Sequence, residues 1–315
     1  MRAVGVFEFG GSEVLRVINL PDPEPGAGEV VVRVHAATVN PTDIMTRNGA
    51  RAELLRADGD GPYLMGMEAA GEVAAIGESA DTDLRRGDRV MAIVVPKGAY
   101  GAYAELVAVP AESVVRSPAG VTDAEAATLP MNGLTARMAL DTLHLKRGSV
   151  VAITGAAGTL GGYLIQLARA DGLTVVADAS QADEGLVKGL GADFVVRRGD
   201  DVARRIRQVI VSGVDGLADA ALLGDKVIPA VRDGGKVVTL RGYRGPEVPV
   251  REITFHPILV RNYFKEHEKL DRLRQQVEAG QVTLRVARTF PAQDAALAHR
   301  LLEAGGVRGR LVLEF

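Results

Sequence analysis

The residues from Gly155 to Gly161 have the types and the spacing that bind a pyrophosphate. They read Gly-Ala-Ala-Gly-Thr-Leu-Gly, with the glycines in a G-x-x-G-x-x-G pattern. Glycine lets the backbone turn tightly and leaves N–H groups bare at the start of a helix, where the helix dipole favours an anion. We therefore predict a dinucleotide-binding turn, and we assign to it Gly155, Ala156, Gly158, Thr159, Leu160 and Gly161.

The flanking residues supply the elements that must position this turn. Val150–Thr154 is a β-branched run typical of a buried strand. Apolar residues then recur at helical spacing until Gly172, and a second apolar strand, Leu173–Ala177, ends in Asp178. A lone glycine pattern also fits a purely structural turn, but the order strand, turn, helix, strand makes dinucleotide binding the stronger interpretation.

Charged residues beyond the second strand bear on the choice of cofactor. An acid about 20 residues past the glycines normally bonds the ribose 2′-OH and repels a 2′-phosphate, so Asp178 favours NADH. Arg197 and Arg198 are able to clamp a phosphate, which favours NADPH, or are solvated charges at a strand end.

A second candidate site is the sequence Asn40-Pro41-Thr42-Asp43, which follows a predicted strand. The amide of Asn40 can donate to a carbonyl oxygen that becomes negative as hydride arrives. Asp43 is a second catalytic candidate, and the alternative for it is a local turn of the Asx type. Arg47 either anchors this loop or contacts the substrate.

Composition limits the protein class. The chain has 315 residues, 47% apolar and 24% charged, which suits two globular domains or one large one. Its net charge of −3 gives no case for nucleic acid or anionic membranes. The absence of cysteine excludes disulfides, iron–sulfur clusters and thiolate zinc. With neither a signal-peptide run nor an apolar segment long enough to span a bilayer, we expect a soluble, cytoplasmic protein.

The pattern of elements predicts an α/β fold with two domains. Residues 1–122 read as short strands between Pro/Gly clusters, interrupted by a polar loop or short helix at 50–61. A capping box at Thr122–Glu125 begins a helix and marks the domain change. Residues 123–258 alternate strands and helices, which predicts a doubly wound parallel sheet. The tail, 259–315, reads as helix, strand, helix, strand.

The expected elements can be given by range. In the first part we predict strands at 2–9, 29–37, 71–76, 89–94 and 102–109. In the second part we predict strands at 150–154, 174–178, 194–196, 216–220 and 236–240, and helices at 183–190 and 202–211. In the tail we predict a helix around Leu270–Val277, a strand at 286–290, a helix at 292–303 and a strand at 310–314.

The order of short motifs resembles the medium-chain dehydrogenase/reductase superfamily and, within it, the zinc-free quinone oxidoreductase branch that includes zeta-crystallin. The match runs nearly end to end. Its landmarks are 39–43 (VNPTD) with Arg47 and Gly49, 66–71 (GMEAAG), 101–105 (GAYAE), Leu129-Pro130 with 133–136 (GLTA), the Gly155–Gly161 turn, 190–193 (LGAD) and 308–313 (RGRLVL). The resemblance implies a GroES-like substrate domain, 1–122 completed by 259–315, a Rossmann-type domain at 123–258, an active site in the cleft between them, and a homodimer or tetramer.

The motif at Gly66–Gly71 departs from that of zinc-dependent relatives. They carry G-H-E-x-x-G with a ligating histidine, whereas this chain has Met67 there and no cysteine. A catalytic zinc needs three protein ligands, and the five histidines show no ligand spacing, so we read them as surface or packing residues and expect no metal. Without a Lewis acid, hydride must go to an activated acceptor such as a quinone or the β-carbon of an enone.

The resemblance also implies cofactor contacts. In the family the Asn40 position lies near the nicotinamide and substrate, and Thr135 follows the helix that flanks the nicotinamide; its alternative is a bond to its own backbone. The family mostly uses NADPH, and binds its phosphate with a small hydroxyl residue, a lysine and a tyrosine. Ser180 keeps the hydroxyl and Arg198 stands near the tyrosine position, but Asp183 stands where the lysine is usual. We therefore expect NADPH, with NADH not excluded. Further cofactor contacts are assigned to Leu240, Gly242, Phe264 and Arg310.

Tyr63 is the candidate proton donor. Enoyl-thioester reductases of the superfamily place a tyrosine slightly earlier, where this chain has none, so thioester reduction is the less favoured alternative. Tyr63 can substitute, pack in the core, or leave protonation to water.

Two classes of function remain. The leading hypothesis is a zinc-independent, NAD(P)H-dependent reductase of quinones or α,β-unsaturated carbonyls, acting on a small molecule. The other is a cofactor-binding scaffold, sensor or RNA-binding protein with little catalysis. Only 4% of the residues are aromatic, and this, with the acidic balance, counts against RNA.

Overall fold

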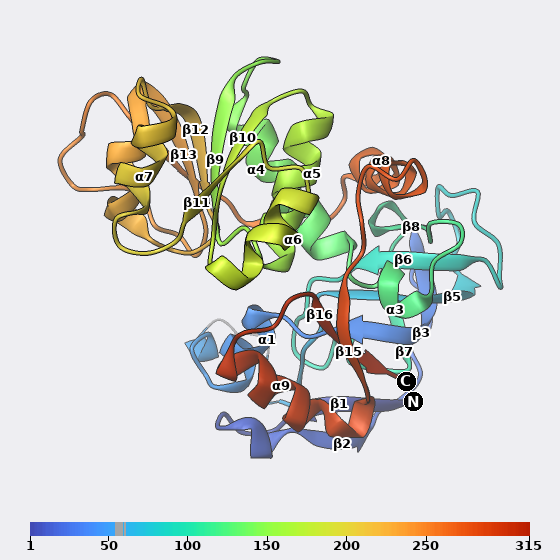
Figure 1. The fold of residues 1–315 in the computed structure, drawn as a ribbon. Coiled ribbons are helices and arrows are strands. Elements are labelled where there is room, and N and C mark those ends of the chain that lie inside the picture. Colours follow the sequence, from blue (N-terminus) through green and yellow to red (C-terminus); the bar gives the residue numbers. More distant parts are fainter. Residues whose placement is uncertain (54–58, 60) are drawn as a thin grey trace. The chain divides into compact units, whose positions relative to one another are not determined.

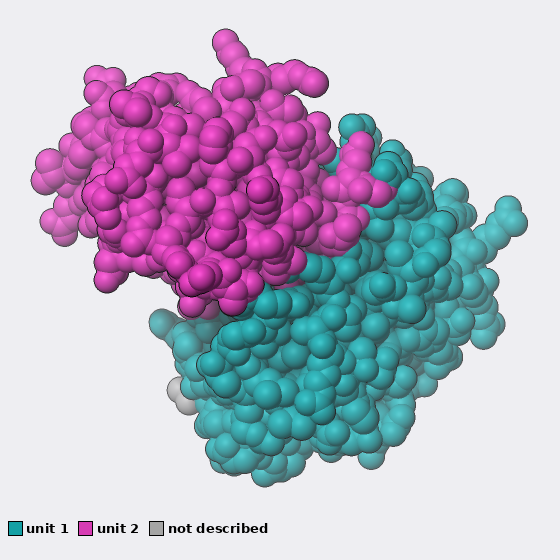
Figure 2. All heavy atoms as spheres, in the orientation of Figure 1, with its two compact units in different colours: residues 1–131, 264–279, 284–315 teal, residues 132–263, 280–283 magenta. Residues whose placement is uncertain are grey.

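The computed structural model describes residues 1–53, 59 and 61–315, so much of the expected loop 50–61 lies outside the described residues. They form two compact units, coloured separately in Figure 2. Unit 1 contains residues 1–131, 264–279 and 284–315, and unit 2 contains residues 132–263 and 280–283. The capping-box helix α3 (Asp123–Ala126) belongs to unit 1, where Asp123 pairs with His35 and Arg89.

Unit 1 is built from strands and short helices. Its strands are β1 (Arg2–Val6), β2 (Arg16–Asn19), β3 (Glu29–Thr38), β4 (Tyr63–Leu64), β5 (Glu68–Ile76), β6 (Arg89–Ile93), β7 (Leu106–Pro110), β8 (Val114–Arg116), β15 (Val286–Pro291) and β16 (Arg310–Glu314). Its other helices are α1 (Pro41–Arg47), α8 (His267–Glu278) and α9 (Ala295–Ala304).

Strand β3 organises unit 1. It pairs antiparallel with β5, β7 and β16, inside a sheet of order β15-β16-β3-β5-β6-β8. Figure 1 shows the C-terminal β16, in red, beside the blue β3. The apolar run of β3 explains its central place, because Val30 and Val32 are fully buried in the core of this unit. A separate three-stranded sheet has the order β2-β1-β4.

Unit 2 contains a parallel sheet covered by helices. Its strands are β9 (Val150–Thr154), β10 (Thr174–Ala179), β11 (Phe194–Arg197), β12 (Val214–Asp219), β13 (Val231–Thr239) and β14 (Thr254–Pro257). Its helices are α5 (Thr159–Ala170), α6 (Glu184–Gly189), α7 (Val202–Val209) and most of α4 (Pro130–Leu143).

The sheet of unit 2 has the doubly wound order. The strands run β11-β10-β9-β12-β13-β14, and every neighbouring pair is parallel. The strand order reverses between β9 and β12, which is where ligands bind in open α/β sheets. In Figure 1, α5 and α6 lie on one face of this sheet and α7 lies on the other. The predicted α/β class with a Rossmann-type sheet is confirmed.

Among the residues that the structure describes, no helix is long and apolar enough to cross a membrane.

Candidate cofactor site and buried polar network

The glycine turn has the geometry that its sequence predicts. Gly155 follows β9 with φ +67°, and Gly158 is the N-cap of α5. A Cβ on Gly161 would lie 2.4 Å from the carbonyl oxygen of Gly155 and 2.6 Å from Cα of Ala156. Only glycine fits such a close backbone approach. The turn therefore leaves the first N–H groups of α5 without bulky side chains around them, as an anion site requires.

Asp178 lies behind this turn. Its carboxylate oxygen Oδ1 accepts a hydrogen bond from the N–H of Ala156 at 3.1 Å, and the side chain is buried. Burial raises the pKa of Asp178, opposed by hydrogen bonds from the backbone of Ala156 and Gly155. The sequence assigned this acid to the ribose, but its observed partner is the protein backbone.

Ser180 and Arg198 follow the ends of β10 and β11. The hydroxyl of Ser180 donates to Oδ2 of Asp183 at 2.6 Å. Arg198 is exposed, and its backbone N–H donates to Ala179 O at 2.9 Å. Within the described part of the chain, its guanidinium makes no hydrogen bond or ion pair, and its positive charge lowers the pKa of Asp178 against the larger effect of burial.

A small pocket lies at the carboxyl ends of β12 and β13. Its lining includes Thr135, Leu160 and Leu240, three residues that the sequence assigned to the cofactor, together with Asp219 and Ile258. Thr135 lies inside α4 and not after a helix, so that expectation was wrong. The expected helix start near 122 is the short α3, and the chain begins a second helix at Pro130.

Asp219 and Gly242 complete this edge of the sheet. The carboxylate of Asp219 is buried and accepts hydrogen bonds from Thr154 Oγ1 at 2.7 Å and from Gly224 N–H at 2.9 Å. Gly242 follows β13 with φ +81° and open space around its Cα, so a ligand can approach its backbone.

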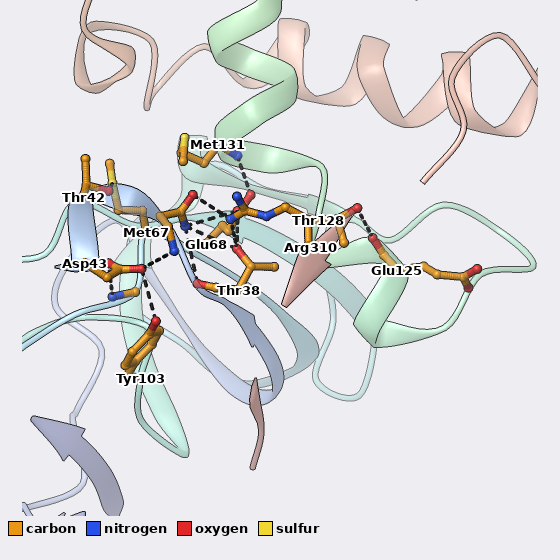
Figure 3. Close-up of polar contacts among 12 residues, drawn as sticks. Thr38, Thr42, Asp43, Met67, Glu68, Tyr103, Glu125, Thr128, Met131 and Arg310 are labelled. Carbon is orange, nitrogen blue, oxygen red and sulfur yellow. Dashed lines mark hydrogen bonds and ion pairs between the residues drawn. The ribbon is translucent and has the colours of Figure 1, made fainter. Parts of the chain in front are cut away.

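Arg310 lies in a buried polar network of unit 1 (Figure 3). Its guanidinium donates to Glu68 Oε1 and to Asn40 Oδ1 at 2.6 Å each, and also to Thr38 Oγ1. The second oxygen of Glu68 accepts from the N–H of Met131 at 2.7 Å. Glu68 and Asn40 are fully buried, so the arginine neutralises a carboxylate that water cannot solvate. The sequence assigned Arg310 to the cofactor; its observed contacts are with this network.

Asp43 is the third residue of α1 and forms a capping box with Asn40, the N-cap of that helix. Its Oδ2 accepts from the N–H of Asn40 at 2.8 Å and from the hydroxyl of Tyr103 at 3.2 Å, and its Oδ1 accepts from Gly66 N–H at 3.0 Å. Complete burial raises the pKa of Asp43 to about 6. Asp43 thus fixes the turn between β3 and α1, which is the local role that its sequence left open.

A histidine extends this chain of contacts. The Tyr103 hydroxyl gives its one proton to Asp43, so it accepts from Nε2–H of His299 at 3.2 Å, and the ring is neutral. Burial and the nearby Arg47 lower the pKa of His299 to about 3. Arg47 is buried and pairs with Glu303 of α9 at 2.6 Å, so it anchors α1.

Tyr63 and Phe264 contact protein groups in unit 1. The Tyr63 hydroxyl donates to the Gly59 carbonyl at 2.7 Å, and its ring stacks on Phe9 at 5.3 Å between centroids. This engagement favours the packing role over proton donation. The carbonyl of Phe264 accepts from the hydroxyl of Ser113 at 2.7 Å.

Met67 occupies the position that would hold a zinc-ligating histidine. Its sulfur accepts a hydrogen bond from Thr42 Oγ1 at 2.9 Å. Among the residues described, no group of three His, Cys, Asp or Glu side chains could hold a metal ion. A thioether beside a hydroxyl is a poor donor set for Zn²⁺, so these residues do not fit a catalytic zinc.

Four residues that build these sites were not among the candidates predicted from the sequence. Glu68 and Tyr103 stand inside motifs of the family resemblance, and Asp219 lies in the predicted strand 216–220, so each had a signal. His299 had none, because nothing in its neighbours along the chain predicts a buried partner 196 residues away.

Known proteins resemble this chain along nearly its whole length. Residues 26–119 match the alcohol dehydrogenase GroES-like domain, and residues 190–313 match a family described as zinc-binding dehydrogenase. The quinone oxidoreductase of Sus scrofa is 30% identical over 99% of this chain and 97% of its own length. The chloroplastic NADPH-dependent alkenal/one oxidoreductase of Arabidopsis thaliana is 30% identical over 99% of this chain and 79% of its own. The solved quinone oxidoreductase of Coxiella burnetii has a TM-score of 0.84 at 29% identity, covering 100% of this chain and 99% of that one.

Proposed function

The chain belongs to the quinone oxidoreductase family of the medium-chain dehydrogenase/reductase superfamily, and from this premise we propose that it reduces quinones or α,β-unsaturated carbonyls with NAD(P)H. The observation that carries the proposal is the glycine turn at the switch point of the parallel sheet, where Gly161 approaches the backbone of Gly155 too closely for any other residue. The names of the relatives supply the two substrate classes.

The residues present fit a dinucleotide. The N–H groups of the glycine turn would bind the pyrophosphate, and Thr135 and Leu240 would contact the cofactor from the pocket that they line. Bound nicotinamide supplies the hydride. Arg198 would bind a 2′-phosphate, since it is exposed and its guanidinium makes no hydrogen bond or ion pair within the described residues. Ser180 would add its hydroxyl by giving up its bond to Asp183. We therefore propose NADPH as the preferred cofactor.

The acceptor must be activated without a metal. We propose zinc independence because Met67 stands where the ligating histidine would be, its sulfur is bonded by Thr42, and the sequence has no cysteine. A quinone or an enone conjugates the site of hydride addition with a carbonyl, so it needs no Lewis acid. Because the Tyr63 hydroxyl is engaged by Gly59, we propose that the product takes its proton from water.

The first experiment is a titration followed by a substrate panel. NADPH and NADH are titrated into the protein, and oxidation of the bound cofactor is followed with 1,2- and 1,4-quinones, simple enones and an enoyl thioester. We expect turnover of quinones or enones and little with the thioester. A protein that binds the cofactor but reduces neither class contradicts the reductase and favours a scaffold or sensor.

A single variant tests the cofactor preference. Arg198→Gln removes the proposed phosphate ligand, so the affinity for NADPH should fall about tenfold while that for NADH stays within about threefold. Equal losses for both cofactors would contradict the assignment. Arg204→Gln is the matched control, because Arg204 already pairs with Asp201.

The assembly and location are also proposals. We propose a homodimer joined through β14, because this strand ends the sheet of unit 2 and its outer edge has no partner strand in the described chain. Light scattering of the purified protein tests this, and a monomer at all concentrations contradicts it. We propose a cytoplasmic location, in keeping with the absence of a membrane-spanning helix from the described residues.

A further inference from the structure

Asp178 has a position in the sheet that directs its side chain to the glycine turn. In the register of β10 and β9, Ala177 lies beside Ile153, so Asp178 stands level with the end of β9, where the turn begins. Its Oδ1 accepts from the N–H of Ala156 at 3.1 Å. The contact therefore follows from the strand register and does not depend on a chance rotamer.

The backbone N–H of Ala156, which donates to Asp178, is shielded from solvent. Ala156 is fully buried, and a buried backbone N–H without a partner is costly. The carboxylate satisfies it and also receives a bond from the backbone of Gly155. Both partners belong to the turn that would bind the pyrophosphate.

The same carboxylate presents little surface to a ligand. Asp178 is 6% exposed, whereas Ser180, two residues on, is partly exposed and Arg198 is exposed. Ser180 follows the end of β10 and its hydroxyl bonds Asp183, whereas Asp178 lies inside the strand. A ribose arriving from solvent would meet Ser180 and Arg198 before Asp178.

We infer that Asp178 is a positioning residue that holds the glycine turn in the shape needed for the pyrophosphate, and that it does not select between NADH and NADPH. This inference rests on the proposed function. It reverses the expectation that an acid at the end of the second strand repels a 2′-phosphate. Selection between NADH and NADPH then depends on residues that follow Asp178 in the chain, Ser180 and Arg198 among them.

Two substitutions in the full-length protein separate the roles. Asp178→Asn removes the charge but keeps an oxygen that accepts the N–H of Ala156, and Asp178→Ala removes both. Binding of NADPH and of NADH is measured for each by fluorescence titration. We expect the alanine variant to lose about tenfold or more in affinity for both cofactors, the asparagine variant to recover most of this loss, and the ratio of the two affinities to stay within about threefold in both.

Asp215→Ala is the matched control for a merely structural effect. Asp215 accepts a hydrogen bond from the backbone N–H of Val150. Val150 begins β9, whereas the glycine turn follows the other end of this strand. Its loss should lower the melting temperature without lowering cofactor affinity. An asparagine variant that shifts the affinity ratio tenfold towards NADPH overturns the inference alone, as does an alanine variant that binds both cofactors normally. A wild-type chain that binds neither cofactor overturns the proposed function as well.

Discussion

Tyr63 offers the most direct test of a single residue. Its hydroxyl donates to Gly59, and its ring stacks on Phe9 at an angle of 15° between the planes. Tyr63→Phe keeps the stacking and loses only the hydrogen bond. We expect enone or quinone reduction to stay within about threefold, and the free energy of unfolding to fall by about 1 kcal/mol. Steady-state kinetics and denaturant unfolding measure the two effects.

The control for this variant is Tyr100→Phe. The Tyr100 hydroxyl makes no side-chain hydrogen bond with the part of the chain that the structure describes, so its loss should leave the free energy of unfolding nearly unchanged. A fall of about a hundredfold in the kcat of Tyr63→Phe, with stability intact, would show that this tyrosine is the proton donor.

His299 predicts a dependence of stability on pH. Burial and Arg47 lower its pKa to about 3, whereas an unfolded histidine titrates near 6.5, so the unfolded state binds more protons between these values. Its contribution is present above pH 6.5 and is lost as the pH falls towards 3. The loss is about 1.4 kcal/mol per pH unit, or roughly 2 kcal/mol between pH 6.5 and 5.

Asp43 acts in the opposite direction within part of this window. Its pKa is raised from 3.8 to about 6, so the folded state binds more protons and stability falls as the pH rises from 4 to 6. His299→Gln removes the histidine titration and leaves that of Asp43. Denaturant unfolding at pH 7 and pH 5 should therefore show the variant losing less stability on acidification than the wild type. Equal losses in both proteins would contradict a neutral, buried His299.

The glycine turn is the element on which cofactor binding depends. Gly161→Ala would place a Cβ 2.4 Å from the carbonyl oxygen of Gly155, and both atoms belong to rigid parts of the turn. We expect the affinity for NADPH to fall by about tenfold or more, and the free energy of unfolding to fall by about 1–3 kcal/mol. Fluorescence titration and thermal unfolding measure the two losses.

Gly185→Ala is the matched helical control. Gly185 lies in α6, where an added Cβ would have nothing within 4 Å, so alanine should raise the free energy of unfolding by about 0.5–1 kcal/mol and leave cofactor binding unchanged. A Gly161 variant that behaves like this control would contradict the close packing of the turn.

Elements with a strong local pattern could be predicted from the sequence. The strand Val150–Thr154 and the strand Arg310–Glu314 have the predicted bounds, because a buried apolar run specifies a strand without help from distant residues. The glycine turn was predicted for a similar reason, since the backbone at Gly155 and the packing at Gly161 require glycine. Helix α1 was not predicted, because a seven-residue helix depends on its cap more than on any periodicity.

Other elements depend on tertiary context. The edge strand β2 is short and mostly exposed, and β14 has no alternation, so neither carries a strong sequence signal. The same holds for the polar network. Arg310 meets Asn40 across 270 residues of chain, and only the pairing of β16 with β3 brings them together. A motif can therefore name Arg310 without revealing its partner.

Each of the two units is built from separate segments of the chain. Unit 1 takes its first 131 residues and much of the C-terminal tail, and the C-terminal β16 supplies Arg310 to the network formed by the N-terminal residues Thr38, Asn40 and Glu68. Unit 1 is therefore incomplete without the tail. Unit 2, by contrast, holds its whole glycine turn and parallel sheet in residues 132–263.

We propose that the whole molecule transfers hydride from NAD(P)H to a conjugated acceptor. The most direct measurement is the reduction of a simple enone with NADPH that carries deuterium at the hydride-donating ring carbon, followed by NMR of the product. We predict deuterium at the β-carbon and a solvent proton at the α-carbon. Cofactor oxidation that leaves no deuterium in the product, or no turnover of enones and quinones by a protein that binds NADPH, would contradict the account.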